Sequence, residues 1–267
     1  MWDGRDDSGK IVSDGPYIVS LIAWDDNGNV NLDYQSCMTV VVDNRVPQAS
    51  ARPMEGSMIF SPDGDNSKDS FSFRNTGSVE NDWQIVVRNG DGQAVRTQDY
   101  KDRSAPRDFT WDGTADDGKR VPDGVYSVSL VAKDEAGNVT ESKVAGIVVD
   151  TSRPLVSIAT DSPVMSPNND GIKDSLQIVP SIESTRGLET WRVFVLDPEK
   201  KEVWAVSGNG DNPPQQSYVF RGYDSQGKVL PDGSYEAGID LSYSNGYKPQ
   251  KLSDSFYLDR TPPSATI

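Results

Sequence analysis

The sequence contains no histidine and only one cysteine, Cys37. Without histidine, the chain has no Ser-His-Asp or Cys-His catalytic group and no histidine-ligated metal site. With a single cysteine, it forms no disulfide within the chain and no cysteine-based zinc site. Cys37 lies in the strand-like segment SCMTVVVD, where a lone cysteine is typical of a small core or edge residue. These counts leave the redox compartment open.

Positive charge and long apolar segments are also scarce. The chain has 26 lysines and arginines against 41 acidic residues, a net charge of −15 and a pI near 4.4. A field of this sign repels nucleic-acid phosphates and anionic lipid surfaces, so we expect no nucleic-acid partner. No apolar run approaches the roughly 18 residues of a membrane helix, so we expect no membrane insertion. The opening residues, MWDGRDD, lack the pattern of a signal peptide.

One turn-rich loop occurs three times, at intervals of 109 residues. Its copies are WDGRDDSGKIVSDGPY from Trp2, WDGTADDGKRVPDGVY from Trp111 and FRGYDSQGKVLPDGSY from Phe220. Asp-Gly pairs are strong turn signals, and this density of them excludes a helix. After each copy, apolar and polar residues alternate with period two, starting at Tyr17, Tyr126 or Tyr235. That alternation predicts a β-strand with one buried face.

Each repeat ends in a short segment that predicts a stiff linker. The closing strands VVVD, IVVD and FYLD end at Asp43, Asp150 and Asp259, and a proline follows four residues later in each case. We therefore predict four parts: residues 1–46, the last three strands of an immunoglobulin-like domain; residues 47–153 and 154–262, two complete domains; and residues 263–267, the first strand of a further unit.

The predicted fold class is all-β, as tandem immunoglobulin-like β-sandwiches of about seven strands each. From Pro154 onward the sequence shows seven short strands separated by turns, with no helical periodicity. Trp83 and Trp191 on the third strand, and the tyrosine that opens the sixth, are typical aromatic positions of this fold. The recurring loop is then the corner between strands five and six, with Val12, Val121 and Leu230 expected to close it.

The first part, residues 1–46, lacks the first four strands of a sandwich. We expect its apolar face to be exposed and the segment not to be stable by itself. Its expected completion is strand complementation by sequence upstream of Met1 or by another chain. The residues of this face are Trp2, Tyr17, Val19, Leu21 and Ala23.

The motif W-D-G-x-x-x-x-G-K-x-V-P-D-G-x-Y, followed by a strand and D-x-x-G-N, resembles the FlgD-type immunoglobulin-like domain, first described in flagellar hook-capping proteins. The segment SPNNDGIKD is similar to the opening motif of bacterial surface and sorting domains associated with gliding motility. The resemblance implies tandem domains of large secreted or surface proteins of bacteria. The third repeat departs from it at Phe220, Arg221 and Tyr247. The second repeat matches through Trp111, Gly113, Gly118, Lys119, Pro122, Asp123, Gly124, Tyr126, Gly137 and Asn138.

Two related loops carry the candidate metal ligands: Asp63, Asp65 and Asp69 in one, and Asn168, Asp170 and Asp174 in the other. Oxygen ligands at alternating positions around a tight turn are how a loop wraps Ca²⁺, although both loops lack the bidentate glutamate of an EF-hand. The alternative is a set of Asx turns that begin the next strand by accepting backbone hydrogen bonds. We expect no other cofactor.

Two further groups of residues are more typical of structure than of binding. The corner-loop acids Asp6, Asp7, Asp116 and Asp117 are expected to be solvated turn residues, because the third repeat has Ser225 and Gln226 at two of these positions. Trp24 and Trp204 fall outside the repeated pattern. An exposed tryptophan can stack on a sugar ring, but edge packing or interdomain contact is the favoured interpretation.

A glycosidase needs two positioned carboxylates, yet nearly every aspartate here belongs to a turn shared between repeats. The sequence therefore predicts no enzyme. It favours a structural or adhesive rod or spacer in a longer bacterial protein of the cell surface, the periplasm or the extracellular space. Its expected partners are proteins or neighbouring repeats. The alternatives are a carbohydrate-binding accessory module of a secreted enzyme and a scaffold for assembly of an extracellular filament.

Overall fold

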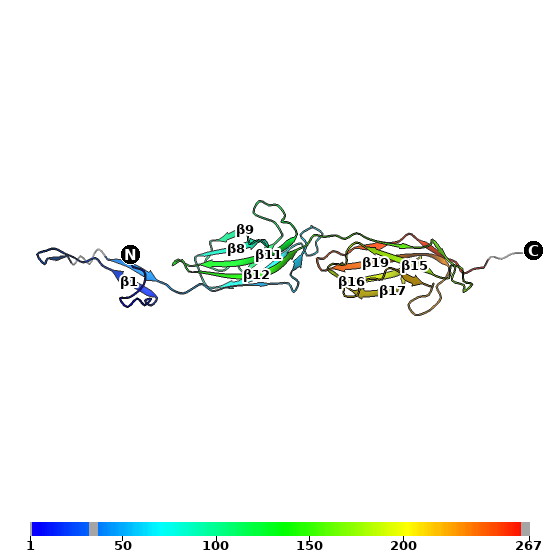
Figure 1. Ribbon diagram of the computed structural model, residues 1–267, viewed down its shortest axis with the longest axis horizontal. Coiled ribbons are helices and arrows are strands. Elements are labelled where there is room, and N and C mark those ends of the chain that lie inside the picture. The colour runs from blue at the N-terminus through cyan, green and yellow to red at the C-terminus, as the bar shows by residue number, and fades with distance from the viewer. Residues whose placement is uncertain (1, 32–36, 263–267) are drawn as a thin grey trace, which may run out of the picture. The chain divides into compact units, whose positions relative to one another are not determined.

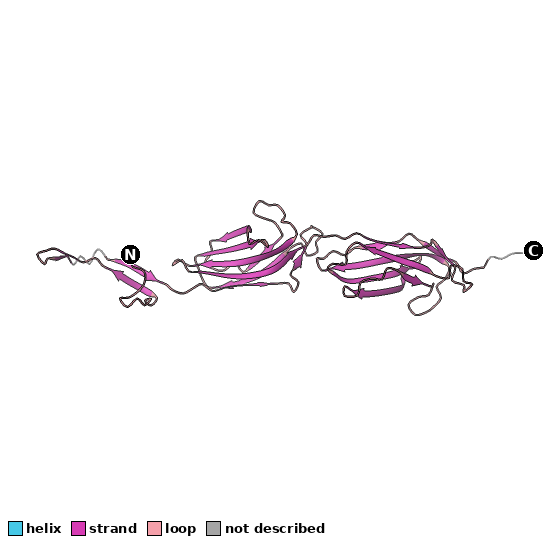
Figure 2. Cartoon of the chain, viewed as in Figure 1, coloured by secondary structure: helices cyan, strands magenta, loops and turns pink. Residues whose placement is uncertain are grey.

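The computed structural model describes residues 2–31 and 37–262, and throughout these ranges the chain forms β-strands and loops without a helix (Figures 1 and 2). The expected all-β class with tandem immunoglobulin-like sandwiches is confirmed. In the described ranges there is no helix long and apolar enough to cross a membrane. The strand expected at 263–267 lies outside the described residues.

The chain forms two compact units. The first contains Met1–Gly56 and Phe71–Ile147, and the second contains Ser57–Ser70 and Val148–Ile267. In the second unit, β6 (Ile59–Phe60) pairs in parallel with the end of β12 (Val139–Val149). The segment Ser57–Ser70 thus groups with residues that follow it by about ninety positions. The domain boundaries drawn from the sequence stay a prediction.

The strands between residues 49 and 149 belong to two sheets, antiparallel except for the pair of β6 and β12. One has the order β10-β7-β5, with β10 at Asp108–Trp111, β7 at Phe71–Gly77 and β5 at Ala49–Pro53. The other has the order β6-β12-β11-β8-β9, with β11 at Gly124–Lys133, β8 at Asp82–Arg88 and β9 at Ala94–Tyr100.

Alternate residues of these strands form a core. On β11 the expected face is buried at Tyr126, Val128, Leu130 and Ala132. Trp83 on β8 is 1% exposed, as predicted for the third strand. Its ring fills the space beside Gly77, where an added Cβ would lie 2.1 Å from the tryptophan Cη2. A side chain at position 77 would therefore displace the tryptophan.

The second unit repeats this arrangement. One sheet has the order β13-β15-β18, with β13 at Val156–Thr160, β15 at Leu176–Ile182 and β18 at Tyr218–Phe220. The other has the order β14-β21-β19-β16-β17, and β20 also pairs with β19. Its strands are β14 at Val164–Met165, β16 at Leu188–Leu196, β17 at Glu202–Asn209, β19 at Gly233–Tyr243, β20 at Gln250–Leu252 and β21 at Phe256–Leu258.

Two details of this strand order differ from the sequence-based prediction. The two-residue strand β14 was not predicted. The last predicted strand, Leu252–Asp259, is confined to β21, and the separate strand β20 ends at its first residue. Both differences arise where a strand is too short for period two to be visible. The buried core includes Trp191, Tyr235, Phe220 and Phe256, so Trp191 and Tyr235 lie where the sequence placed them.

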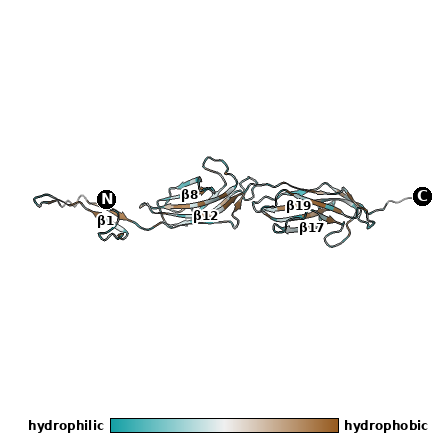
Figure 3. Cartoon of the chain, in the orientation of Figure 1, coloured by the Kyte–Doolittle hydropathy of each residue, from teal (hydrophilic) through white to brown (hydrophobic). Residues whose placement is uncertain are grey.

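In the N-terminal segment, the strands that follow the corner loop also form, but within residues 2–31 and 37–46 no second sheet packs on them. β1 (Gly15–Val19) pairs with β4 (Met38–Val42), and β2 (Ala23–Trp24) pairs with β3 (Val30–Asn31). Leu21 is 75% exposed, whereas Leu130, its counterpart in the second repeat, is 0% exposed. Figure 3 shows the hydrophobic colour on β1. Cys37 is also exposed and is therefore not a core residue.

We predict that truncation of Trp191 to alanine lowers the free energy of unfolding by about 3–5 kcal/mol, because it removes a buried indole and leaves a cavity. The indole Nε1 also donates to the carbonyl oxygens of Asn209 and Asn212 at 3.2 and 2.7 Å. Urea denaturation followed by fluorescence measures the change. The matched control is Trp24→Ala, which removes an exposed ring and should alter stability by less than about 0.5 kcal/mol. Equal effects of the two changes would contradict the assigned core.

We also predict rapid amide hydrogen exchange over residues 15–31 and 37–43 beside slow exchange in β11 and β19. A two-stranded ribbon with exposed apolar side chains is marginally stable in water. Hydrogen exchange on the 267-residue chain, followed by mass spectrometry, provides the measurement. Protection of residues 15–31 and 37–43 equal to that of β11, in a sample shown to be monomeric, would contradict this prediction.

Candidate functional site

The candidate metal ligands lie in two loops with the same backbone path. In each, a serine N–H donates to the oxygen of a later lysine at 2.8 Å: Ser61 to Lys68, and Ser166 to Lys173. These bonds close the loops just before β7 and β15 begin. We refer to Asp63–Asp69 as the first acidic loop and to Asn168–Asp174 as the second acidic loop.

Three positions in each acidic loop have positive φ. They are Gly64, Asn66 and Lys68 in the first loop, at 87°, 67° and 56°, and Asn169, Gly171 and Lys173 in the second, at 66°, 87° and 57°. Glycine and asparagine exchange places between the loops, and both residues tolerate the left-handed region. Two different sequences thus give one conformation.

The last aspartate of each acidic loop holds this path by accepting backbone hydrogen bonds. Asp69 accepts from the N–H groups of Gly64 and Asn66 at 2.6 and 2.8 Å. Asp174 accepts from Asn169 and Gly171 at 2.7 and 2.8 Å. The two carboxylates therefore satisfy N–H groups that no strand partner could reach.

The earlier ligand candidates form Asx turns. The N–H of Asp65 donates to Asp63 at 3.1 Å, and the N–H of Ser67 donates to Asp65 at 2.8 Å. The second acidic loop repeats the pattern, with Asn168 accepting from Asp170 at 3.0 Å and Asp170 accepting from Ile172 at 2.8 Å. The structure thus contains Asx turns, the alternative to calcium binding that the sequence suggested for these loops.

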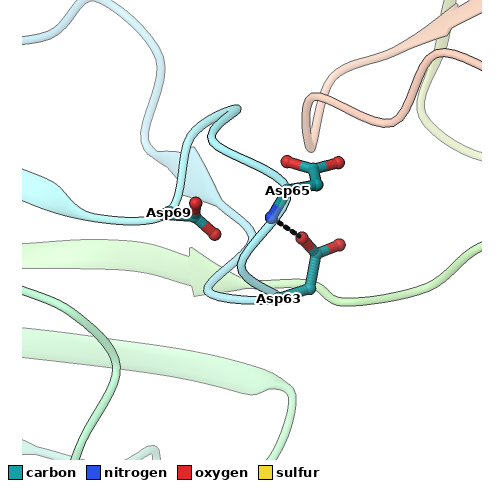
Figure 4. A group of neighbouring side chains, drawn as sticks. All are labelled: Asp63, Asp65 and Asp69. Atoms are coloured by element: carbon teal, nitrogen blue, oxygen red, sulfur yellow. Dashed lines mark hydrogen bonds between the residues drawn. The ribbon is translucent and has the colours of Figure 1, made fainter.

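The first acidic loop also gathers three carboxylates. Oxygens of Asp63, Asp65 and Asp69 lie within 4.8 Å of one another. Figure 4 shows these three side chains on the loop. That spacing suits Ca²⁺, which takes oxygen ligands at about 2.3–2.6 Å. In the second acidic loop an amide replaces one carboxylate, and its Nδ2 donates to Asp170 at 3.0 Å.

A guanidinium already neutralises part of the first acidic loop. Arg153 approaches Asp63 Oδ2 through Nη2 at 2.7 Å and through Nε at 3.0 Å, and Asp65 Oδ2 at 3.3 Å. Partial burial opposes ionisation of Asp63, but the hydrogen bonds from Arg153 and from the N–H of Asp65 outweigh it, so its pKa lies below the usual value. A calcium ion at this loop would have to compete with Arg153.

Within the second unit, the first acidic loop also contacts the turn that follows β19. Ser67 Oγ donates to the Gly246 oxygen at 3.2 Å, and Lys68 Nζ donates to the Ser244 oxygen at 2.5 Å. The guanidinium of Arg153 lies 5.5 Å from the centre of the Tyr247 ring. Gly246 has φ of 97°, and a Cβ there would lie 2.8 Å from Ser67 Oγ, so glycine suits this approach.

Asparagine side chains bind the two linkers. Asn138 Nδ2 donates to the Asp43 oxygen at 3.0 Å, and Asn245 Nδ2 donates to the oxygens of Asp150 and Ser152 at 3.2 and 2.9 Å. Each asparagine lies 95 residues after the aspartate that it contacts. We call these contacts the linker clamps. The sequence analysis missed this role of Asn138 and Asn245; the only sequence signal was asparagine beside the glycine of each turn.

The recurring loop is the corner between sheets, as predicted. The hydroxyl of Tyr126 donates to the Pro122 oxygen at 2.7 Å, and that of Tyr235 donates to the Pro231 oxygen at 2.8 Å. The Trp111 and Tyr126 rings meet edge to face, with centroids 5.1 Å apart. Val121 and Leu230 are buried and Val12 is half-buried.

The corner-loop acids are exposed turn residues that bind backbone. Asp6 accepts from the N–H of Ser8, Asp117 from that of Lys119, and Asp116 from that of Thr97 on β9. Asp7 is exposed. The structure therefore supports the turn interpretation for this group.

The two tryptophans outside the repeat differ. Trp204 is half-buried, and its ring meets Tyr218 and Phe220 edge to face at centroid distances of 6.4 and 5.8 Å. Packing against the core therefore accounts for Trp204. Trp24, on the short strand β2, is 75% exposed.

Comparison with known proteins finds a family match for part of the chain. Residues 60–136 match the FlgD Ig-like domain family, and this segment includes the first acidic loop and the corner loop Trp111–Tyr126. The resemblance drawn from the sequence is thus confirmed over these residues. No match was found among curated proteins.

Several solved structures are similar at low identity. The tetra-tandem repeat from the extending region of a large adhesion protein is 17% identical, with a TM-score of 0.39 over 96% of this chain and 66% of that one, so this chain spans just under two thirds of its length. A Ca²⁺-stabilised adhesin of an Antarctic bacterium is 12% identical, with a TM-score of 0.39 over 91% and 56% of the two chains. Fibronectin(III)-like modules of Clostridium thermocellum CbhA are 13% identical, with a TM-score of 0.39 over 81% and 99%.

Calcium ligation by the acidic loops stays a prediction. If Ca²⁺ binds the folded loops, millimolar Ca²⁺ raises the melting temperature by mass action. Asp170→Ala should remove the part of this rise that comes from the second acidic loop. Arg153→Ala should enlarge the part that comes from the first, because it removes the competing guanidinium. Differential scanning calorimetry with Ca²⁺ and with Mg²⁺ as the control measures these shifts. Melting temperatures unchanged by Ca²⁺ in all three proteins would leave the Asx turns as the whole role of these residues.

Proposed function

We propose that this chain is a non-catalytic structural and adhesive spacer made of tandem immunoglobulin-like repeats. The observation that carries the proposal is the linker clamp, which occurs at both linkers with the same separation of 95 residues. A linker bound by side chains and followed by proline has fewer conformations than a free one. Restricting motion at each junction is what a spacer requires.

The use of the acidic side chains supports a non-catalytic role. In both acidic loops and in the corner loops the carboxylates accept hydrogen bonds from nearby N–H groups. General acid–base catalysis instead needs carboxyl groups whose pKa lies near the working pH. The pKa of Asp6, Asp63 and Asp117 is shifted downward, away from that range: hydrogen bonds lower it for Asp6 and Asp117, and for Asp63 they outweigh partial burial.

We place the spacer outside the cytoplasm of a bacterium, at the cell surface, in the periplasm or in a secreted protein. The support is the match of residues 60–136 to the FlgD Ig-like domain and the implied similarity to tandem domains of surface proteins. A net charge of −15 keeps such repeats soluble and apart from one another.

The proposed partners are neighbouring repeats and other proteins. Val19 and Leu21, which lie on the face that is buried in the second repeat, are exposed and suit strand complementation by further sequence of the same polypeptide or by a second chain. Parallel pairing of β6 with β12 and of β14 with β21 indicates how one added strand would lie against β4.

The proposal predicts that loss of the second linker clamp loosens the junction. Asn245→Asp keeps the acceptor that the Tyr247 N–H uses at 3.0 Å, but it replaces the donor to Asp150 and Ser152. Spin labels at Thr76→Cys and Val219→Cys, with Cys37→Ser, report the distance across the junction by pulsed electron resonance. We expect a broader distance distribution for Asn245→Asp than for the parent.

Asn212→Asp is the matched control, because it makes the same chemical change at an exposed side chain. It should leave the distribution unchanged. If Asn245→Asp also leaves the distribution unchanged while the melting temperature is preserved, the linker clamp does not restrict the junction and the spacer proposal loses its support.

A further inference from the structure

The outer face of the sheet β10-β7-β5 carries two arginines side by side. Phe71 and Phe73 of β7 point into the core, so the alternate residue Arg74 faces outward. In the antiparallel pair of β5 and β7, Arg52 lies directly opposite Arg74, and Ser50 lies directly opposite Thr76. The register therefore places two guanidiniums beside two hydroxyls.

This arrangement costs stability. Like charges directly opposite each other in an antiparallel pair are destabilising. Arg74 Nε is paired with Asp108 Oδ1 at 3.2 Å, whereas Arg52 has no ion pair within residues 2–31 and 37–262. The two cations lie together in a chain whose net charge is −15. An anion bound between them would offset this repulsion.

The second unit shows that the fold does not need the arginines. Its strands β13 and β15 have the same register, with Ser157 opposite Ser181 and Ala159 opposite Val179. The hydroxyl pair is thus present in both repeats. The arginine pair, however, occurs only in the first unit. In the second unit, Ala159 and Val179 occupy the equivalent positions.

A hollow adjoins the two arginines. It is open to solvent, has a volume of about 490 Å³ and is lined by Ser50, Arg52, Pro53, Met54, Arg74 and Thr76. Met54 is exposed. Sites for small molecules commonly have volumes of about 300–1,000 Å³ and combine apolar contacts with a few polar groups. This hollow has both components.

We propose that this hollow binds an acidic saccharide residue. The guanidiniums of Arg52 and Arg74 would bind its carboxylate or sulfate group through charge-assisted hydrogen bonds. The hydroxyls of Ser50 and Thr76 both donate and accept, as sugar hydroxyls require. Pro53 and Met54 offer apolar surface to the C–H face of the ring. The site goes beyond the spacer role, which does not depend on it.

A saccharide fits the hollow better than an acidic peptide does. The lining alternates cations with neutral hydroxyls and apolar side chains, which matches a ring that carries one anionic group among several hydroxyls. An acidic peptide offers successive carboxylates but no hydroxyls for Ser50 and Thr76 to pair with. Because the guanidiniums bind an anionic group, binding should weaken as salt is added.

Isothermal titration of the full chain tests the proposal. The probes are trigalacturonic acid for the carboxylate, a chondroitin sulfate tetrasaccharide for the sulfate, maltotriose as the neutral sugar and tetraglutamate as the acidic peptide. We expect binding of at least one acidic saccharide and none of maltotriose. The double variant Arg52→Ala, Arg74→Val, which copies the second unit, should weaken that binding at least tenfold.

The control variant is Arg186→Ala, which removes one exposed positive charge from the second unit and should leave the affinity within about twofold. Arg52→Lys with Arg74→Lys retains the charge but not the bidentate geometry, and should retain part of the affinity. The proposal is overturned if neither acidic saccharide binds, if the double variant binds as tightly as the parent, or if tetraglutamate binds as tightly as the saccharides.

Discussion

A chain that builds two facing sheets must cross between them without leaving backbone polar groups unpaired. Here a tyrosine hydroxyl holds each crossing by donating to the carbonyl oxygen four residues earlier: Tyr17 to Ser13, Tyr126 to Pro122 and Tyr235 to Pro231. The corner fixes where the next strand begins. Because side chains alternate along that strand, the corner also decides which of them enter the core. The linkers and both acidic loops depend on strands placed in this way.

The acidic composition is largely explained by backbone hydrogen bonding. The two acidic loops reach the same conformation with different residues, because glycine and asparagine occupy equivalent positive-φ positions and Asp69 and Asp174 accept equivalent N–H groups. Arg153 then neutralises only the first of these loops. Loops of the same conformation in the two repeats therefore have different electrostatic surroundings, and ion pairs tie the first loop to Arg153.

Two features are not required by the sandwich itself. Val19 and Leu21 remain exposed although their counterparts in β11, Val128 and Leu130, are buried. The opposed pair of Arg52 and Arg74 adds repulsion that Ala159 and Val179 avoid in the second unit. An exposed apolar face and an opposed pair of cations both gain stability from a bound partner, so these positions are where binding is expected.

The sequence by itself determined the all-β class, the corner loops and the buried faces of β11 and β19, because turn residues and period-two alternation are local properties of the chain. It also placed Trp83 and Trp191 in the core. Only the tertiary structure showed that Ser57–Ser70 joins the second unit, that Arg153 neutralises Asp63, and that Arg52 faces Arg74. These relations depend on strand register and on contacts between residues distant in sequence, which no local pattern encodes.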